Sequence, residues 1–261
     1  MRQDGTRIVL KLEYDGAGYC GFQLQPGVPT VQGEIEKALY RLTGECTRVT
    51  AASRTDTGVH ASGQMVSFQA GAVLGLPEYV SGLNYYLDAG IAVKAAYRVD
   101  RDFDVRKAAA SREYRYSILS GLTRSPLRHG SYFLVRGRLD MENMNEACRV
   151  LVGRHDFAAF TTSYDRRLKD TVRTIERAAF TREGDLIVFT VVAGSFLQHQ
   201  VRNIVGSLVR VGLGRMTVAD FCDIVKSGGT GKAGPRAPAA GLCLTRVNYP
   251  APFWEEKWGD Q

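Results

Sequence analysis

The order of strand-like and helix-like segments in the first hundred residues limits the folds open to this chain. The pattern predicts, in order, a strand at 8–14, a helix capped by Thr30 and ended by Gly44, a short strand at 48–52, a strand at 65–68, a helix from Pro77 to Gly90, and a strand at 91–99. Two successive β-α-β patterns favour a split βαβ unit. In such a unit the helices cover one face of the sheet and leave the other open.

The second half of the chain begins after a charged stretch without periodicity, residues 101–106, where we place a domain junction. We therefore expect an N-terminal lobe at 1–104 and a C-terminal lobe at 105–261. The later segments are a strand at 112–119, a helix capped by Asp140 and closed by Gly153, a hairpin of 173–181 and 186–192, helices at 196–211 and 217–226, and a strand at 242–249. The fold class is mixed α/β.

One loop, residues 51–61, concentrates the chemistry of the first lobe. It contains Arg54, Asp56 and His60 and lies between two predicted strands. If the backbone is extended there, Arg54 and Asp56 point the same way and face one pocket. An adjacent Arg favours the ionised Asp, which can act as nucleophile or general base. The alternative is an ordinary turn with a structural ion pair, and the spacing alone does not decide between the two.

Composition narrows the class of partner. The chain has 261 residues with 34 Lys and Arg against 27 Asp and Glu, a net charge of +7, so a polyanion is the first partner to consider. Its five cysteines are isolated, which indicates neither a zinc ribbon nor a disulfide framework. The start lacks the apolar core of a signal peptide, and no segment is apolar enough to span a membrane. We expect a cytoplasmic protein.

Three motifs in order along the chain carry a resemblance. They are Tyr14-Asp15-Gly16-x-x-Tyr19-x-Gly21-x-Gln23-x-Gln25, Arg54-Thr55-Asp56-x-Gly58-Val59-His60-Ala61 and Phe196-x-x-His199-x-x-Arg202-Asn203-Ile204-Val205-Gly206. Together they resemble the tRNA pseudouridine synthase A family. The resemblance implies two ferredoxin-like (split βαβ) lobes forming one extended mixed sheet with a central catalytic cleft. It also implies a homodimer that isomerises uridine to pseudouridine at positions 38, 39 and 40 of the tRNA anticodon stem-loop, without a cofactor or metal.

The resemblance also assigns roles to residues. Asp56 matches the catalytic nucleophile, and Arg54 matches its partner, which holds the Asp in the free enzyme and helps fill the gap left by the extruded nucleotide. Tyr114, in an Arg-x-Tyr-x-Tyr context, matches the residue that stacks on the target uracil, whereas Tyr116 is expected in the core. Leu242, which follows residues 237–241, would form a wall of the pocket.

Other residues are placed by simpler arguments. We expect His60 to brace the loop and group it with the substrate-binding residues. Phe196, His199 and Arg202 are spaced by three on the expected helix start, which predicts core packing plus one phosphate contact from Arg202. The Gly- and Pro-rich stretch 228–238 is either a solvated loop or a phosphate-contacting one. Thr57, Phe22 and Gln200 depart from the residues frequent in the family, which leaves the packing around them open.

Two other classes of function stay open on the sequence. A metal nuclease could use Asp15, Asp56 and His60, and a glycosidase-like enzyme would need a second carboxylate near Asp56. A non-catalytic RNA-binding or chaperone protein would fit the basic charge. No phosphate-binding P-loop and no G-x-G-x-x-G after a strand occurs in the sequence.

Overall fold

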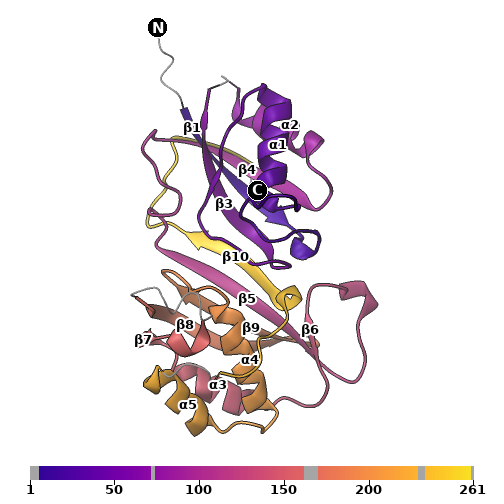
Figure 1. The fold of residues 1–261 in the computed structure, drawn as a ribbon, viewed down its shortest axis with the longest axis vertical. Helices are drawn as coiled ribbons and strands as arrows, with labels where there is room; N and C mark the ends of the chain where they lie inside the picture. The colour runs from indigo at the N-terminus through magenta and orange to yellow at the C-terminus, as the bar shows by residue number, and fades with distance from the viewer. Residues whose placement is uncertain (1–5, 72–73, 162–169, 229–232, 260–261) are drawn as a thin grey trace. The chain divides into compact units, whose positions relative to one another are not determined.

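The computed structural model describes residues 6–71, 74–161, 170–228 and 233–259 (Figure 1). The chain divides into two compact units. The first contains the residues up to Ala110 together with those from Leu244 onward, and the second contains Ser111–Cys243. The predicted boundary at 104/105 thus lies a few residues early, and the last part of the chain groups with the first unit instead of the second. The mixed α/β class is confirmed.

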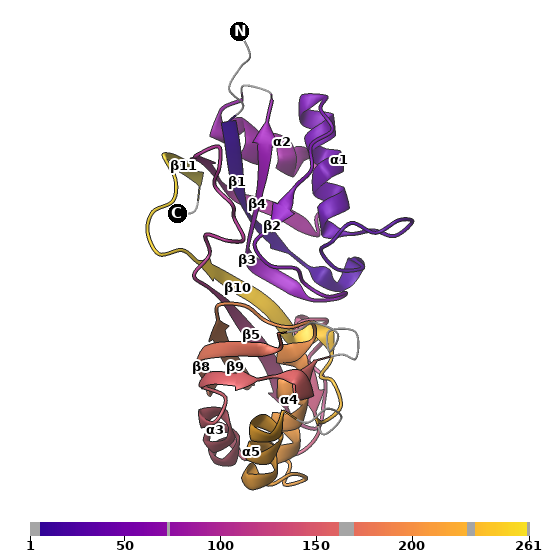
Figure 2. The ribbon, with the colours of Figure 1, turned by 60° about the vertical axis from the view of Figure 1, so that its left-hand side comes forward.

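The first unit is a split βαβ fold. Its elements are β1 (Thr6–Tyr14), α1 (Val31–Thr43), β2 (Thr50–Ala51), β3 (His60–Ala70), α2 (Leu76–Tyr86), β4 (Ile91–Val99), β10 (Leu242–Asn248, from Leu244 onward) and β11 (Glu256–Gly259). The strand order is β11-β4-β1-β3-β10, with β2 also paired to β3. Helices α1 and α2 lie side by side on the sheet (Figures 1 and 2). The order β4-β1-β3-β2 is that of a ferredoxin-like unit.

Local signals set the ends of α1 and α2. The Thr30 Oγ1 accepts a hydrogen bond from the Gly33 N–H at 3.2 Å, and Gly44 ends α1 with φ 76°. Both ends of α1 were predicted. Helix α2 stops at Tyr86, four residues before the predicted end at Gly90, because Leu87 already has an extended backbone. The Leu87 N–H still closes the last turn on the Leu83 carbonyl.

The described part of the second unit combines a sheet with three α-helices. Its elements are β5 (Ser111–Ser120), β6 (Phe133–Val135), α3 (Met141–Arg149), β7 (Gly153–Asp156), β8 (Val172–Glu183), β9 (Leu186–Ala193), α4 (Gln200–Gly212) and α5 (Val218–Ser227), with short 3-10 helices η2 (Pro126–Arg128), η3 (Ala158–Phe160) and η5 (Ala239–Gly241). The 3-10 helix η1 (Gly16–Gly18) belongs to the first unit. The order β5-β9-β8-β7 is antiparallel, and β6 adds to β5 in parallel. The predicted β8–β9 hairpin is confirmed.

Helix α4 begins later than predicted. His199 has a left-handed backbone with φ 61°, which a helix cannot continue through, so α4 starts at Gln200 instead of 196. Before it, the Leu197 N–H donates to the Gln200 Oε1 at 2.8 Å, and the Gln200 N–H donates to the Leu197 carbonyl. Phe196 and His199 therefore precede the helix, and the prediction that they share a helical face with Arg202 is wrong.

An aromatic cluster explains why the end of the chain belongs to the first unit. Phe253 stacks on Phe103 with ring centroids 5.1 Å apart and contacts Tyr97 at 5.4 Å and Tyr249 at 4.4 Å. The Tyr249 hydroxyl also donates to the Val105 carbonyl at 2.8 Å. Packing of buried Tyr97 with half-buried Phe103, Tyr249 and Phe253 holds these residues together although they are far apart in sequence.

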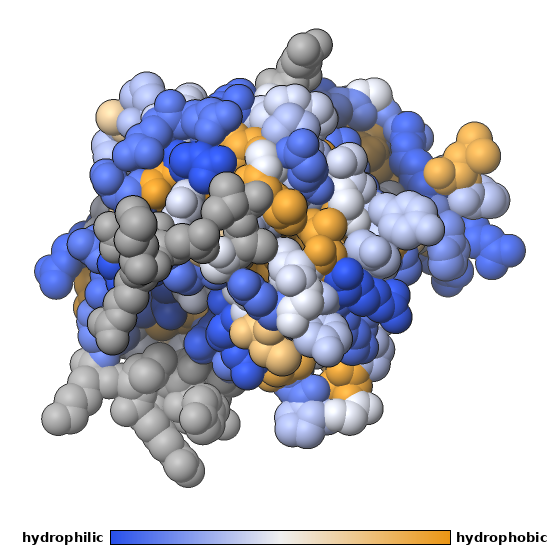
Figure 3. Space-filling view, turned by 90° about the horizontal axis from the view of Figure 1, so that it is seen from above, coloured by the Kyte–Doolittle hydropathy of each residue, from blue (hydrophilic) through white to orange (hydrophobic). Residues whose placement is uncertain are grey.

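Several large hydrophobic side chains of the described residues are exposed on the surface. On the face drawn in Figure 3, hydrophobic side chains form a short band and small groups among hydrophilic ones. The most exposed large hydrophobic residues of the described ranges are Tyr85 near the end of α2, Leu122 just after β5, and Leu127 in the short helix η2. Single exposed apolar side chains of this kind are usual on folded proteins and need no special role.

Candidate active site

Asp56 lies on a tight loop between β2 and β3, as predicted. The Val59 N–H donates to the Asp56 carbonyl at 3.1 Å, and Gly58 adopts φ 76°, so the chain reverses directly after the carboxylate. Asp56 is half-buried. A half-buried carboxylate is partly shielded from water, which suits a nucleophile.

Two glycines of the first motif let its backbone touch this loop. A Cβ on Gly21, which has φ 87°, would lie 2.9 Å from the Thr55 carbonyl oxygen, and one on Gly16 would lie 2.1 Å from the Val59 carbonyl oxygen. The Phe22 N–H donates to the Thr55 carbonyl at 3.0 Å. The segment around Tyr14–Phe22 therefore packs directly against the Asp56 loop. A larger residue in place of Gly16 or Gly21 would push the two backbones apart.

His60 joins the same two segments. Its Nδ1 lies 3.0 Å from the Asp15 Oδ1 and 3.2 Å from the Gly16 backbone nitrogen. The His60 side chain is mostly buried, with 15% of it exposed. These contacts are those of a brace that ties the start of β3 to the turn after β1. A role of His60 in binding substrate stays a prediction.

Arg54 does not take the place that the resemblance implies for the free enzyme. Its side chain is exposed and forms no hydrogen bond or ion pair with any residue in the described part of the chain. Thr55, between Arg54 and Asp56, is buried. Because side chains alternate in direction along an extended backbone, Arg54 and Asp56 lie on the more exposed side of the loop, as predicted. No Arg54–Asp56 ion pair forms in this structure.

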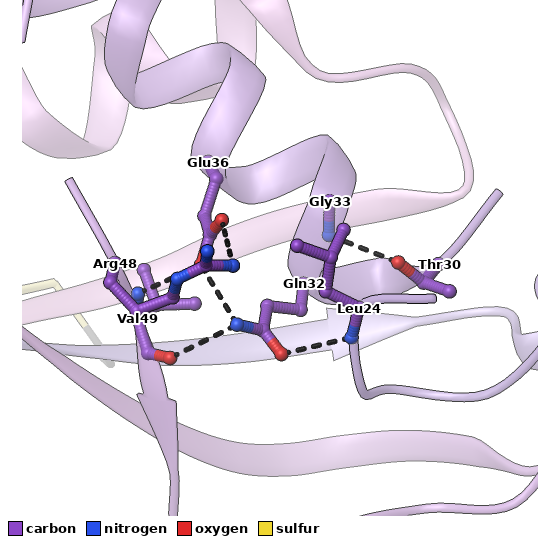
Figure 4. Close-up of polar contacts among 7 residues, drawn as sticks. All are labelled: Leu24, Thr30, Gln32, Gly33, Glu36, Arg48 and Val49. Carbon is purple, nitrogen blue, oxygen red and sulfur yellow. Dashed lines mark hydrogen bonds and ion pairs between the residues drawn. The ribbon is translucent and has the colours of Figure 1, made fainter. Parts of the chain in front are cut away.

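The rest of the first motif is held by one buried amide, which the sequence did not single out (Figure 4). The Gln32 Oε1 accepts from the Leu24 N–H at 3.0 Å, and its Nε2 donates to the Glu36 carboxylate at 2.8 Å and the Val49 carbonyl at 3.4 Å. Glu36 in turn accepts from the Val49 N–H and pairs with Arg48 at 3.0 Å. Helix α1 thereby links the loop after Phe22 to the strand that leads to Asp56.

Tyr114 lies on β5 of the second unit and is almost fully buried, with 5% of it exposed. Its ring meets Phe196 edge to face, with centroids 5.3 Å apart. Tyr116 on the same strand is completely buried, its hydroxyl donates to the Pro238 carbonyl at 2.8 Å, and burial raises its pKa. The prediction that Tyr116 is a core residue is confirmed. A stacking role for Tyr114 stays a prediction.

Arg202 lies in the first turn of α4 and already has a backbone partner. Its Nε donates to the Ala237 carbonyl at 2.8 Å, and the Ala237 N–H donates to the Arg202 carbonyl at 3.1 Å. A Cβ on Gly206 would lie 1.8 Å from the Pro235 carbonyl oxygen, so the chain around residues 234–238 packs directly on α4. This part of the predicted 228–238 loop is therefore not a free linker. Residues 229–232 of that loop lie outside the described residues.

Leu242 is the first residue of β10 and is buried. It follows η5, where a Cβ on Gly241 would lie 2.6 Å from the ring of Tyr116. Of the predicted site residues, Arg54, Asp56 and His60 belong to the first unit, whereas Tyr114, Arg202 and Leu242 belong to the second. Within the first unit the three share one loop and the start of β3.

Among the residues that the structure describes, no group of three or more His, Cys, Asp or Glu side chains is placed to hold a metal ion. In the same part of the chain, every helix is too short or too polar to cross a bilayer.

Sequence comparison identifies the class of enzyme. The family described as tRNA pseudouridine synthase matches residues 12–106 and 147–250, so this chain belongs to that family of isomerases. The tRNA pseudouridine synthase A of Myxococcus xanthus is 43% identical over 93% of this chain and 92% of its own length. The proteins of the same name from Thiobacillus denitrificans and Neisseria meningitidis serogroup C are 41% and 40% identical, each over 95% of this chain and 95% and 93% of their own lengths.

Proposed function

We propose that this chain isomerises uridine to pseudouridine at positions 38, 39 and 40 of the anticodon stem-loop of tRNA, with Asp56 as the nucleophile. The observation that carries the proposal is the Asp56 loop itself. A half-buried carboxylate lies on a tight turn whose backbone is hydrogen-bonded to the first motif, in a chain of the tRNA pseudouridine synthase family.

The reaction needs one carboxylate and an enclosed site. The N1–C1′ bond of uridine breaks, the uracil turns, and a C5–C1′ bond forms, while C5 loses its proton and N1 gains one. No electron is gained or lost overall, so the atoms of the product are those of the substrate. Asp56 engages either C1′ or the uracil ring while the base is detached. Shielding from water protects that intermediate from hydrolysis.

The other candidate residues have supporting roles in this proposal. Tyr114 stacks on the target uracil, a contact worth about 1–3 kcal/mol per base, and Leu242 forms a wall of the pocket. Arg54, exposed and without a partner in the described part of the chain, is available to contact the RNA where the target nucleotide leaves its helix. Arg202, whose Nε donates to the Ala237 carbonyl, contacts a phosphate of the RNA with its guanidinium group.

The proposal extends to assembly and location. The enzyme works as a homodimer in the cytoplasm, holds one tRNA with both subunits and uses neither a metal nor an organic cofactor. A wide basic surface is the physical reason for the dimer, because selecting neighbouring uridines by shape instead of by sequence needs contacts that span the tRNA.

The test is to incubate tRNA transcripts with the wild type, Asp56→Asn and Asp102→Asn, with and without EDTA, and to map pseudouridine by carbodiimide treatment and primer extension. Asp102 is an exposed carboxylate away from the loop and serves as the matched control. We expect product from the wild type and Asp102→Asn in EDTA, at the anticodon stem-loop. Asp56→Asn should bind tRNA normally and form none, because only the charge of the nucleophile is lost.

Three results would contradict the proposal. Product from a clean Asp56→Asn preparation would remove the nucleophile assignment. Chain cleavage that stops in EDTA and returns with magnesium would favour the nuclease. Intact, unmodified tRNA bound by the wild type would favour a non-catalytic RNA-binding protein.

A further inference from the structure

The side-chain amide of Gln64 is also buried, and it hydrogen-bonds the backbone of Ser53, the residue before Arg54. Gln64 lies on β3 and is completely buried. Its Nε2 donates to the Ser53 carbonyl at 2.7 Å, and its Oε1 accepts from the N–H groups of Ser53 at 3.4 Å and Met65 at 3.1 Å. A buried amide is stable only when its donors and acceptor are used, so the Gln64 side chain is committed to one orientation and fixes Ser53 with it.

Thr55, the residue after Arg54, is held by a hydrogen bond between its hydroxyl group and that of Tyr14. The Tyr14 Oη and the Thr55 Oγ1 are 2.8 Å apart, and the residues are only 3% and 7% exposed. The Gln64 Nε2, which donates to the Ser53 carbonyl, also donates to the Tyr14 Oη at 3.4 Å. Strands β1 and β3 pair directly, with Leu12 opposite Gln64. The network is therefore built on two neighbouring interior strands of the sheet, and strands hold a side chain in place more precisely than a loop does.

The network ends one peptide bond from the nucleophile. The Thr55 side chain is held by Tyr14, and the Thr55 carbonyl accepts from the Phe22 N–H at 3.0 Å. The peptide that joins Thr55 to Asp56 is thus fixed from both sides. With Gly58 turning the chain just beyond, the direction in which Asp56 leaves the backbone is set by the adjacent Thr55 and by two buried side chains from distant parts of the sequence, Tyr14 and Gln64.

We propose that Tyr14, Thr55 and Gln64 are positioning residues for the reaction: their buried network sets where the Asp56 carboxylate points. This inference rests on the proposed role of Asp56 as the nucleophile. None of the three side chains needs to touch the RNA. Their contribution belongs to the chemical step and not to tRNA binding, because displacing a reacting group by about 1 Å can cost about 100-fold in rate.

The test compares variants that differ by single polar atoms. Thr55→Val keeps the shape and removes the hydroxyl, Thr55→Ser keeps the hydroxyl, and Tyr14→Phe removes its partner. Tyr79→Phe is the matched control, because Tyr79 is as buried but lies on α2, where its ring packs on Phe68. The readouts are the single-turnover rate of tritium release from C5 of labelled uridine in tRNA, the Kd for tRNA, and the melting temperature. Wild type and Asp56→Asn are measured alongside.

We expect the single-turnover rate to fall about 10- to 100-fold in Thr55→Val and Tyr14→Phe, with the Kd for tRNA within about twofold of wild type. Thr55→Ser should recover most of the rate, and the Thr55→Val/Tyr14→Phe double variant should lose no more than the worse single one, because both remove the same interaction.

The inference is overturned if Tyr14→Phe turns over like Tyr79→Phe, if Thr55→Ser is as slow as Thr55→Val, or if the loss lies in the Kd. If Thr55→Val does not fold, Tyr14→Phe, which lacks a single oxygen atom, decides alone. Activity of Asp56→Asn is a different failure: it would remove the nucleophile, and with it the proposed function on which this network depends.

Discussion

Single residues outside the Asp56 loop determine its shape. Gly16 and Gly21 lie more than thirty residues earlier in the chain, yet their missing side chains let two backbones meet. The clustering of Arg54, Asp56 and His60 could be predicted from their spacing, because residues on one short loop cannot lie far apart. The support from Gln32 and Gln64 could not, because a lone glutamine in an apolar pattern does not indicate which backbone group it binds.

The burial of each cysteine side chain predicts how fast its thiol reacts with an alkylating reagent. Cys148 lies on α3 with 1% of it exposed, and burial raises the pKa of its thiol to about 12, whereas Cys46 is exposed. The native protein should therefore react with iodoacetamide at pH 8 at Cys46 and not at Cys148, because the thiolate is the reactive form. Peptide mass spectrometry of the alkylated protein is the measurement.

A Cys46→Ser variant, otherwise intact, is the control for that experiment. Cys148 should be labelled only after denaturant is added. The unfolded thiol ionises near pH 8.5, so the stability that burial of neutral Cys148 contributes is complete below that pH and is lost as the pH rises toward about 12. Labelling of Cys148 as fast as Cys46 in the native state would show that α3 does not stay packed.

At the scale of elements, helix starts were predictable where a side chain caps them. Thr30, Asp140 and Thr217 each accept from the third N–H of their helix, as their sequences indicate. The start of α4 was not predictable, because it depends on one left-handed residue, His199, and a side chain seldom tolerates that conformation. Strands β6, β7 and β11 are three or four residues long, too short for a periodic signal.

The capping box at the start of α5 stabilises this helix. The Thr217 Oγ1 accepts from the Asp220 N–H at 3.0 Å, and the Asp220 carboxylate accepts from the Thr217 N–H at 3.1 Å. Thr217→Ala should destabilise the second unit by about 0.5–2 kcal/mol, seen as a melting temperature lower by about 2–4 °C per kcal/mol. Asp220→Asn should also destabilise, and Asp223→Asn, an exposed change on the same helix, should not.

The pH dependence of the Asp220→Asn effect follows from its pKa. The hydrogen bonds from Thr217 hold the pKa of Asp220 below its ordinary value. The stability that the carboxylate adds is therefore complete above about pH 3.9 and is lost as the pH falls through the lowered pKa. The difference between wild type and Asp220→Asn in thermal unfolding should be constant from pH 7 to 5 and shrink in more acidic buffer. A difference that grows on acidification would contradict the capping role.

For the molecule as a whole, the sequence predicted two units but not how the chain divides between them. The boundary near residue 104 follows from the charged stretch, and the structure moves it only to Ala110. The return of the last residues to the first unit depends on contacts of Phe253 with Phe103 and Tyr97, about 150 residues apart in sequence. Contacts at such separation leave no mark on local periodicity.

The net charge of the proposed dimer determines how strongly its binding of tRNA depends on salt. Each chain carries +7, so a dimer presents 7 + 7 = +14. Each RNA phosphate that it neutralises should add roughly 0.7–0.9 to the magnitude of the slope of log affinity against log salt. We expect tRNA binding that weakens steeply between low and moderate salt, measured by filter binding, and a dimer by light scattering at micromolar concentration. A fully active monomer would overturn the shared-tRNA proposal, and a flat salt dependence would contradict phosphate contacts, while either result leaves the chemistry proposed for Asp56 intact.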